Sequence, residues 1–321
     1  MTEWQVDHAK PLDVVTAGSW SNFDHLFRVE KLPEPGDTVR IISPIELIEK
    51  TYFGGCAPNT VAAAAKLGAK TGLVSVVGHD FDERGLRDHY ASLGVDLRGL
   101  VVVEGMRCGH SFIFTDGAGV SMTLSHLGVA EGQESLEPDR SLLSTTKVLV
   151  VNYRFDRFAV ACAQIGAEAG ALVIVSGSLA TAPNNAAGIL GAADIVVCNG
   201  HELDLLLAEL GLPSKSSLFT GRLKAIVETH GVRGSEVITP EGQVHIPAIE
   251  PDRVVDTSGA GDGFVGGLAA GLALGNHLHE AVRLGAVVAS FVVEDFGCQT
   301  NLPTYRQASG RLRLGRESPT P

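Results

Sequence analysis

Positive charge is scarce in this sequence. Among 321 residues it has 25 Lys and Arg against 37 Asp and Glu, which gives a formal net charge of -12. The basic residues are scattered, whereas proteins that bind a phosphate backbone gather Lys and Arg on one surface. The composition therefore argues against a nucleic-acid partner.

Cysteine is also rare, and no CxxC pair is present. This spacing suggests neither a zinc site nor a disulfide framework, so the chain fits a reducing cytoplasm. The five cysteines are Cys56, Cys108, Cys162, Cys198 and Cys298.

Long hydrophobic runs are missing as well. The start, MTEWQVDHAK, has no apolar stretch after basic residues, so it does not resemble a signal peptide. The longest apolar segments, such as 264–275, are too short and too rich in glycine to cross a bilayer. We therefore expect a cytoplasmic protein with no membrane partner.

What the sequence has is a large apolar content, 45% hydrophobic against 19% charged residues, which indicates a globular core in one elaborated domain or two. Short apolar runs alternate with helical patterns. Runs covered on both faces predict an α/β fold, a three-layer α/β/α sandwich around a mostly parallel sheet. The expected strands are 13–17, 71–77, 147–151, 172–176, 195–198, 235–239 and 244–246, and the expected helices are 59–67, 81–93, 155–169, 184–190, 202–209 and 219–230.

Two regions break this alternation. Residues 29–42 and 97–127 are β-like, with turn signals and no helix between strands, and predict a small antiparallel lid apart from the main sheet. The final SGRLRLGRESPTP has no periodicity and predicts a flexible tail over 309–321.

The most informative segment is DTSGAGDGFVGG, residues 256–267. Val254-Val255 can end a strand and 259–274 can form a helix, so the segment is predicted to be a strand–loop–helix junction. Free N–H groups at such a helix start, together with the helix dipole, suit an anion such as phosphate. The other interpretation of the glycines is tight packing of the helix against the sheet.

Asp262 is an acid within this otherwise neutral turn. Because a carboxylate repels phosphate, its presence suggests a base that takes a proton from an attacking hydroxyl. We expect the helix start to hold its pKa low, and charge complementarity with the helix dipole is the alternative reason for an Asp here. The G-x-G-x-x-G match at 261–266 lies too late in the chain for a dinucleotide fold.

The motifs along the chain together resemble the ribokinase-like, or pfkB, family of sugar and nucleoside kinases. DTSGAGDGF is similar to the family signature DTxGAGDxF, and the resemblance spans about residues 14–303. The other matching elements are GGCAPN (54–59), VGHDFDERGLRDHYASLGVD (77–96, with Glu83-Arg84 adding spacing), NGHE (199–202) and HGVRG (230–234).

This resemblance implies an ATP-dependent kinase that phosphorylates a hydroxyl, such as a primary CH2OH, of a sugar or nucleoside. It implies one ribokinase-like domain over 1–308, with lid strands from about 27–52 and 97–127. Residue by residue, it makes Asp262 the base and Gly259, Ala260 and Gly261 the anion hole. It places Asn199 and Glu202 near the phosphates of ATP and near Mg²⁺, with the metal contacted through water. It places Gly231 and Gly234 beside the adenine.

For the substrate, Asn22 and Asp24 resemble the family's N-x-D, whose carboxylate binds sugar hydroxyls, and Gly54, Gly55 and Asn59 would line the same pocket. An ordinary turn Asp is the alternative for Asp24. Asp256 and Ser258, with carbonyls near Val292 and Gly297, could bind a monovalent cation such as K⁺, or Asp256 could simply tie the loop down.

Other features depart from the family pattern. Gly128-Val-Ala-Glu131 lacks the family's asparagine, and Arg154 could bind a phosphate or carboxylate or be a surface residue. We interpret Cys56, His110 and His126 as packing or lid residues. An adenosine-like nucleoside kinase and a non-catalytic sensor of the same fold are the alternative functions, and open lid edges suggest a homodimer.

Overall fold

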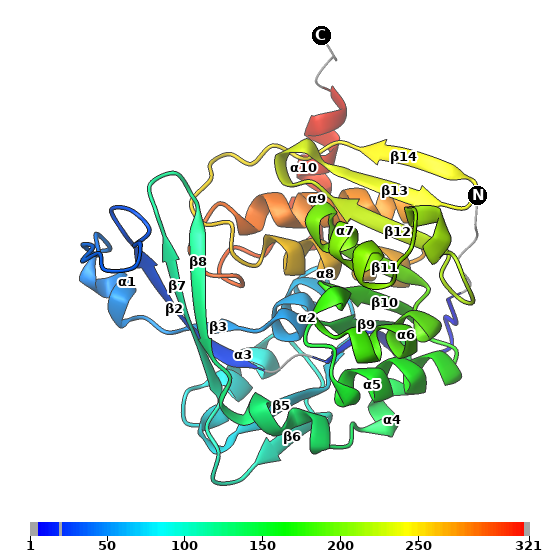
Figure 1. Ribbon diagram of the computed structural model, residues 1–321, viewed down its shortest axis with the longest axis horizontal. Coiled ribbons are helices and arrows are strands. Elements are labelled where there is room, and N and C mark those ends of the chain that lie inside the picture. Colours follow the sequence, from blue (N-terminus) through cyan, green and yellow to red (C-terminus); the bar gives the residue numbers. More distant parts are fainter. Residues whose placement is uncertain (1–5, 19–20, 318–321) are drawn as a thin grey trace.

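The structure, a computed structural model, describes residues 6–18 and 21–317. Its centre is an eight-stranded sheet in the order β14-β13-β12-β11-β10-β9-β1-β4 (Figure 1). All neighbours from β12 to β4 pair in parallel, and only β13 and β14 are antiparallel. The predicted, mostly parallel sheet is therefore confirmed. Its strands are β1 (Leu12–Ala17), β4 (Thr71–Leu73), β9 (Thr146–Asn152), β10 (Leu172–Ser176), β11 (Ile195–Asn199), β12 (Ala225–Thr229), β13 (Ser235–Thr239) and β14 (Gly242–Ile246).

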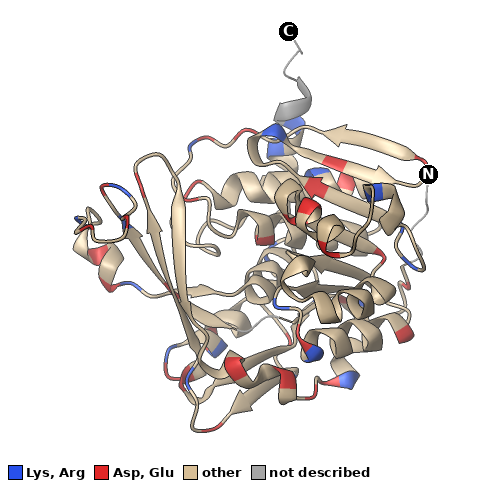
Figure 2. Cartoon of the chain, viewed as in Figure 1, with Lys and Arg blue, Asp and Glu red and all other residues tan. Residues whose placement is uncertain are grey.

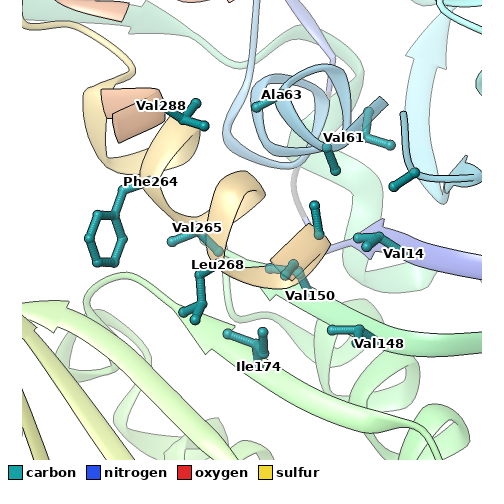
Figure 3. Packing of buried hydrophobic residues seen from close by; sticks show 14 of the residues in the cluster. Val14, Val61, Ala63, Val148, Val150, Ile174, Phe264, Val265, Leu268 and Val288 are labelled. Carbon is teal, nitrogen blue, oxygen red and sulfur yellow. The ribbon is translucent and has the colours of Figure 1, made fainter. Parts of the chain in front are cut away.

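Helices cover both faces of this sheet. Alternate residues of β1 belong to different cores, Val14 to the one that contains α2 and α8 and Val15 to the one that contains α5. Figure 3 shows Leu268 of α8 close to Val150 and Ile174 of the sheet. The three-layer sandwich is thus confirmed. One layer holds α2 (Cys56–Lys66), α8 (Ala260–Ala273) and α9 (Leu278–Val292), and the other α5 (Arg157–Glu168), α6 (Pro183–Ala192) and α7 (Gly200–Glu209).

A separate lid sheet stands beside the main sheet (Figure 1), in the order β3-β2-β7-β8. The expected antiparallel lid is only partly right, because β2 pairs in parallel with β7. Residues 29–42, which were expected to form lid strands, supply only one isolated bridge, between Val29 and Ile41. The lid strand of this region is residues 22–28, just before them in the sequence. The lid strands are β2 (Asn22–Arg28), β3 (Tyr52–Gly54), β7 (Gly109–Thr115) and β8 (Ser121–His126).

Three other expectations differ from the structure. The predicted helix 219–230 is wrong, because the buried run 225–227 forms β12, and a short apolar run does not distinguish a strand from a helix. The predicted strand 71–77 is two strands, β4 and β5 (Ser75–Gly78), and β5 pairs with β6 (Leu100–Val103) in a small sheet. The predicted tail from 309 is helical as far as Glu317, within α10 (Tyr305–Glu317), where Arg311 forms an ion pair with Glu294.

Short helical elements complete the chain. They are α1 (Ile45–Glu49), α3 (Leu86–Ser92), α4 (Arg140–Leu143) and the 3-10 turns η1 (His79–Phe81), η2 (Gly128–Ser135), η3 (Leu179–Thr181), η4 (Lys215–Leu218) and η5 (Gly231–Arg233). Figure 2 shows Lys and Arg scattered among the elements. Within the described ranges, no helix has the length and apolar character needed to span a membrane.

Candidate active site

The glycine-rich turn begins α8, as predicted, but it does not follow a strand. Val254 and Val255 are irregular, and the Val255 N–H donates to the Val293 carbonyl at 2.8 Å. Gly259 caps the helix with φ +73°, and the Gly263 N–H bonds back to the Gly259 carbonyl at 2.9 Å. Amides earlier in the first turn of a helix have no acceptor within it. The Ala260 N–H bonds to the Thr257 carbonyl at 3.3 Å, so the N–H groups of Gly261 and Asp262 are the ones available at the helix start.

The glycines of this segment have two different roles. A Cβ on Gly261 would meet no atom within 4 Å, so this position is open to a ligand. In contrast, a Cβ on Gly266 would lie 2.6 Å from the Ala63 Cβ of α2, and one on Gly267 would lie 2.8 Å from the Gly285 Cα of α9. Gly261 therefore fits the anion-site interpretation, whereas Gly266 and Gly267 have a packing role, against the helices α2 and α9 and not against the sheet as expected. The accidental G-x-G-x-x-G match includes a packing glycine.

Asp262 is half-buried and is bound by two side chains of α2. The Asn59 Nδ2 donates to its Oδ2 at 2.8 Å, and the Cys56 thiol also bonds to it. Burial raises the pKa of Asp262 to about 6, although both hydrogen bonds favour the charged form. The expectation that the helix start would hold this pKa low is wrong, because desolvation is the largest effect.

Asp24 on β2 is a second carboxylate at the same place. The Asn22 Nδ2 donates to its Oδ1 at 2.7 Å, and the Cys298 thiol bonds to its Oδ2 at 3.8 Å. Burial, with a smaller contribution from the charge of Asp262, raises the pKa of Asp24 to about 7. Two carboxylates from the lid and from α8 thus share one site, and each is held by neutral donors.

Two of these site residues were not predicted. Cys298 and Gln299 follow α9, where the sequence FGCQT gave no sign of their role. Gly259 packs directly on Cys298, because a Cβ on this glycine would lie 2.6 Å from Sγ. Gln299 Nε2 donates to the Asn59 Oδ1 at 2.8 Å. The loop after α9 therefore supports both acids, and only the folded chain brings it there.

Asn199 and Glu202 lie at the start of α7, at the carboxyl end of β11. They cap the helix reciprocally: the Asn199 N–H donates to Glu202 Oε2 at 2.8 Å, and the Glu202 N–H donates to Asn199 Oδ1 at 2.9 Å. In the described part of the chain, no group of three His, Cys, Asp or Glu could hold a metal ion. The Glu202 carboxylate, an oxygen donor of the kind that Mg²⁺ prefers, is thus fixed at a helix start at the end of a central strand.

Gly231 and Gly234 form the tight turn between β12 and β13. The His230 N–H donates to the Gly234 carbonyl at 2.8 Å, and a Cβ on Gly234 would lie 2.2 Å from the Ile246 carbonyl oxygen. A Cβ on Gly231 would meet nothing within 4 Å. The turn follows Thr229, which pairs with Asn199 across the sheet. Gly234 therefore has a packing reason, whereas Gly231 faces open space next to α7.

Asp256 ties the start of the loop to the segment after α9. It is 3% exposed, and its two oxygens accept from the N–H groups of Ser258 at 3.0 Å and Gly297 at 3.4 Å. This is the loop-tying role given above as the alternative. A carboxylate and nearby carbonyls are also an all-oxygen donor set, which suits a hard cation.

The remaining candidates lie around the lid. His110 bonds to His25 at 2.9 Å between ring nitrogens, and His126 lies opposite His110 in the lid sheet. The Arg154 Nη1 donates to the Ala130 carbonyl at 3.1 Å, within the family-divergent segment 128–131. Cys56 is closer to the chemistry than predicted, because its thiol binds Asp262.

Comparisons with known proteins point to one family. The family model described as pfkB family carbohydrate kinase matches residues 45–305. A nucleoside kinase of Methanocaldococcus jannaschii is 29% identical over 95% of this chain and 98% of its own, and an ATP-dependent ribose-1-phosphate kinase of Halopiger xanaduensis is 33% identical over 80% and 83%.

Solved structures show the same fold. The M. jannaschii nucleoside kinase structure has a TM-score of 0.84, at 29% identity, and covers 94% of this chain and 99% of its own. The Burkholderia thailandensis nucleoside kinase in complex with inosine has a TM-score of 0.83, at 22% identity, and covers 94% of this chain and 97% of its own. The chain therefore belongs to the pfkB family of carbohydrate kinases and is an ATP-dependent sugar or nucleoside kinase.

Proposed function

We propose that this enzyme phosphorylates the primary hydroxyl of a nucleoside, with Asp24 as the ligand of the ribose hydroxyls and Asp262 as the base. The observation that carries the proposal is the pair of close carboxylates, Asp24 from the lid and Asp262 from α8. Relatives named nucleoside kinase, 29% and 27% identical over almost the whole chain, support a nucleoside over a free sugar.

Asp24 selects the sugar. Its carboxylate is 3% exposed, so a substrate without neighbouring hydroxyls would leave it desolvated and unpaired. Asn22, Gly54, Gly55 and Asn59 border the same position. Gly54 leaves the space that the carboxylate occupies, because a Cβ there would lie 2.1 Å from Asp24 Oδ2.

Asp262 takes the proton of the attacking hydroxyl. The hydroxyl oxygen forms a bond to the γ-phosphorus of ATP, the bond from that phosphorus to the bridging oxygen breaks, and ADP leaves with the electron pair. The amides of Gly261 and Asp262, in the turn that they form with Gly259 and Ala260, neutralise charge on the transferred group. A pKa near neutrality suits a base at physiological pH.

The nucleotide site lies at the start of α7 and at the turn between β12 and β13. ATP with Mg²⁺ supplies the phosphoryl group, and Asn199 and Glu202 face its phosphates, with the metal held through water. Gly231 and Gly234 border the adenine. Asp256 and Ser258, with the carbonyls around Val292 and Gly297, hold a monovalent cation such as K⁺ beside the helix start. We assign residues 1–308 to one kinase domain.

A substrate panel tests the proposal. ADP formation is measured with Mg-ATP and purine or pyrimidine nucleosides, ribose, ribose 1-phosphate and hexoses, and the product is identified by its phosphate position. We expect the highest kcat/KM for a nucleoside and a 5′-monophosphate product. A higher kcat/KM for ribose or ribose 1-phosphate would contradict the nucleoside assignment.

We further propose that the protein is a cytoplasmic homodimer joined through the lid sheet. β8 is an edge strand of the lid sheet. Leu124 on this strand and Val120 just before it are each 55% exposed. An exposed edge with apolar side chains favours association. Light scattering should give twice the monomer mass, and Leu124→Lys should give monomer. The five free cysteines and the use of ATP support a cytoplasmic location.

A further inference from the structure

A chain of side-chain hydrogen bonds leads from α3 to the proposed base. His89 Nε2 bonds to Gln299 Oε1 at 2.8 Å, Gln299 Nε2 to Asn59 Oδ1 at 2.8 Å, and Asn59 Nδ2 to Asp262 Oδ2 at 2.8 Å. We call His89, Gln299 and Asn59 the amide chain. Its members come from α3, the loop after α9 and α2, so they meet only in the folded protein.

The acid at the end fixes the direction of every bond. An ionised carboxylate only accepts, so Asn59 must turn its NH₂ group toward Asp262 and its oxygen toward Gln299. Gln299 must then donate to Asn59 and accept on its own oxygen. His89 is therefore a donor through Nε2–H, and each donor points toward Asp262.

Two further contacts hold this arrangement in place. Gln299 Nε2 also bonds to the Tyr90 hydroxyl at 3.1 Å, which accounts for its second N–H. The His89 ring packs on Phe53, next to Gly54, with centroids 4.7 Å apart. The amide groups of Gln299 and Asn59 consequently have one orientation in which all these contacts are made.

We propose that Gln299 and His89 are positioning residues that act through Asn59 to hold Asp262 in the orientation needed for proton removal. The inference rests on the proposed function of Asp262 as the base. Without Gln299, the Asn59 carbonyl loses its donor, so the Asn59 side chain is held only at its Asp262 end and orients the carboxylate less firmly. Small displacements of a catalytic group reduce turnover more than binding.

A purely structural role is the competing explanation, since the same bonds join α2, α3 and the loop after α9. The two explanations differ in what they affect. Lost structure lowers the melting temperature and kcat and raises the KM for both substrates, and its effect adds to that of removing Asp262. Lost positioning lowers kcat, leaves the KM for ATP unchanged, and has no effect once Asp262 is gone.

The test uses the full chain with Mg-ATP and the best nucleoside of the panel. Gln299→Met keeps the side-chain length without donors, and His89→Phe keeps the ring on Phe53 without the N–H. We expect kcat to fall about 10-fold for Gln299→Met and about 3-fold for His89→Phe, with the KM for ATP within about 2-fold. His89→Gln, which can still donate, should recover most of the loss.

His79→Phe is the matched control, because the exposed His79 ring also makes one hydrogen bond, from Nδ1 to the Met106 carbonyl, outside the amide chain. It should leave kcat unchanged. The double variant Asp262→Asn/Gln299→Met should turn over at the residual rate of Asp262→Asn alone, because the two changes act on one group.

The failures are distinguishable. If Asp262→Asn leaves kcat intact, the base assignment falls, and the positioning role falls with it. If Asp262→Asn lowers kcat while His89→Phe and Gln299→Met do not, only the positioning role is overturned. An equal further loss on the Asp262→Asn background also overturns it. If Gln299→Met fails to fold, the comparison of His89→Phe with His89→Gln decides the question, because His89 is only half-buried.

Discussion

Gly54 lies against the carboxylate of Asp24 so closely that a Cβ on Gly54 would be 2.1 Å from Oδ2 and 2.3 Å from Oδ1. The two residues belong to neighbouring lid strands, since Gly54 pairs with Asn22 in the sheet. We expect Gly54→Ala to displace the carboxylate and to raise the KM for the nucleoside at least about 10-fold, as for a lost hydrogen bond to a charged group. The KM for ATP, measured in the same assay, should stay unchanged. An unaltered nucleoside KM would remove Asp24 from the substrate site.

Burial of Asp24 makes the folded protein more stable in mild acid. Its pKa is about 7 in the folded chain against 3.8 in the unfolded one, so between these pH values the folded state binds more protons. This contribution is complete below pH 3.8 and is lost as the pH rises through 7.

Above pH 7 the buried Asp24 is charged, and this desolvated charge destabilises the folded protein; Asp24→Asn removes the charge. At pH 8 we expect it to raise Tm by at least about 2 °C, the scale of roughly 1 kcal/mol for a protein of this size, while it weakens nucleoside binding. Differential scanning calorimetry at pH 5 and pH 8 measures the effect. A variant that is less stable than the parent at pH 8 would show that the neighbours of Asp24 compensate its charge.

Asp262→Asn should lower kcat by at least about 10²-fold with little change in the KM for ATP, because an amide cannot take the proton. In the parent enzyme, kcat should fall on the acid side with an apparent pKa near 6, since the protonated acid is not a base. Initial rates from pH 5 to 8 give this limb. Turnover that is flat down to pH 5 would contradict the assignment.

Gly261→Ala and Gly267→Ala separate the two roles of glycine in α8. The first adds a methyl group in open space, so stability should stay the same or rise by about 0.5–1 kcal/mol through helix propensity, while the KM for ATP or kcat worsens. The second places a methyl group 2.8 Å from the Gly285 Cα and should destabilise by about 1–3 kcal/mol. Urea unfolding and steady-state kinetics measure both. If Gly261→Ala is fully active, the anion does not approach there.

The sequence by itself determined the layers of the fold and the motif that carries the chemistry. Continuous apolar strands predict a parallel sheet because both faces must be covered, and a glycine-rich helix start with one acid predicts an anion site beside a base. These signals are local, so they are readable from neighbouring residues. The same locality explains the errors: 225–227 alone is compatible with either helix or strand, and the lid strand 22–28 precedes the turn signals that drew attention to 29–42.

Only the tertiary structure decided how the two acids are tuned. The pKa of Asp262 depends on burial among segments far apart in the chain, and burial raises it, whereas the local signal, a helix start, predicted a lower value. Cys298 and Gln299 reach Asp24 and Asn59 across more than two hundred residues. Desolvation and side-chain hydrogen bonds depend on distance in space, so no spacing along the sequence could have revealed them.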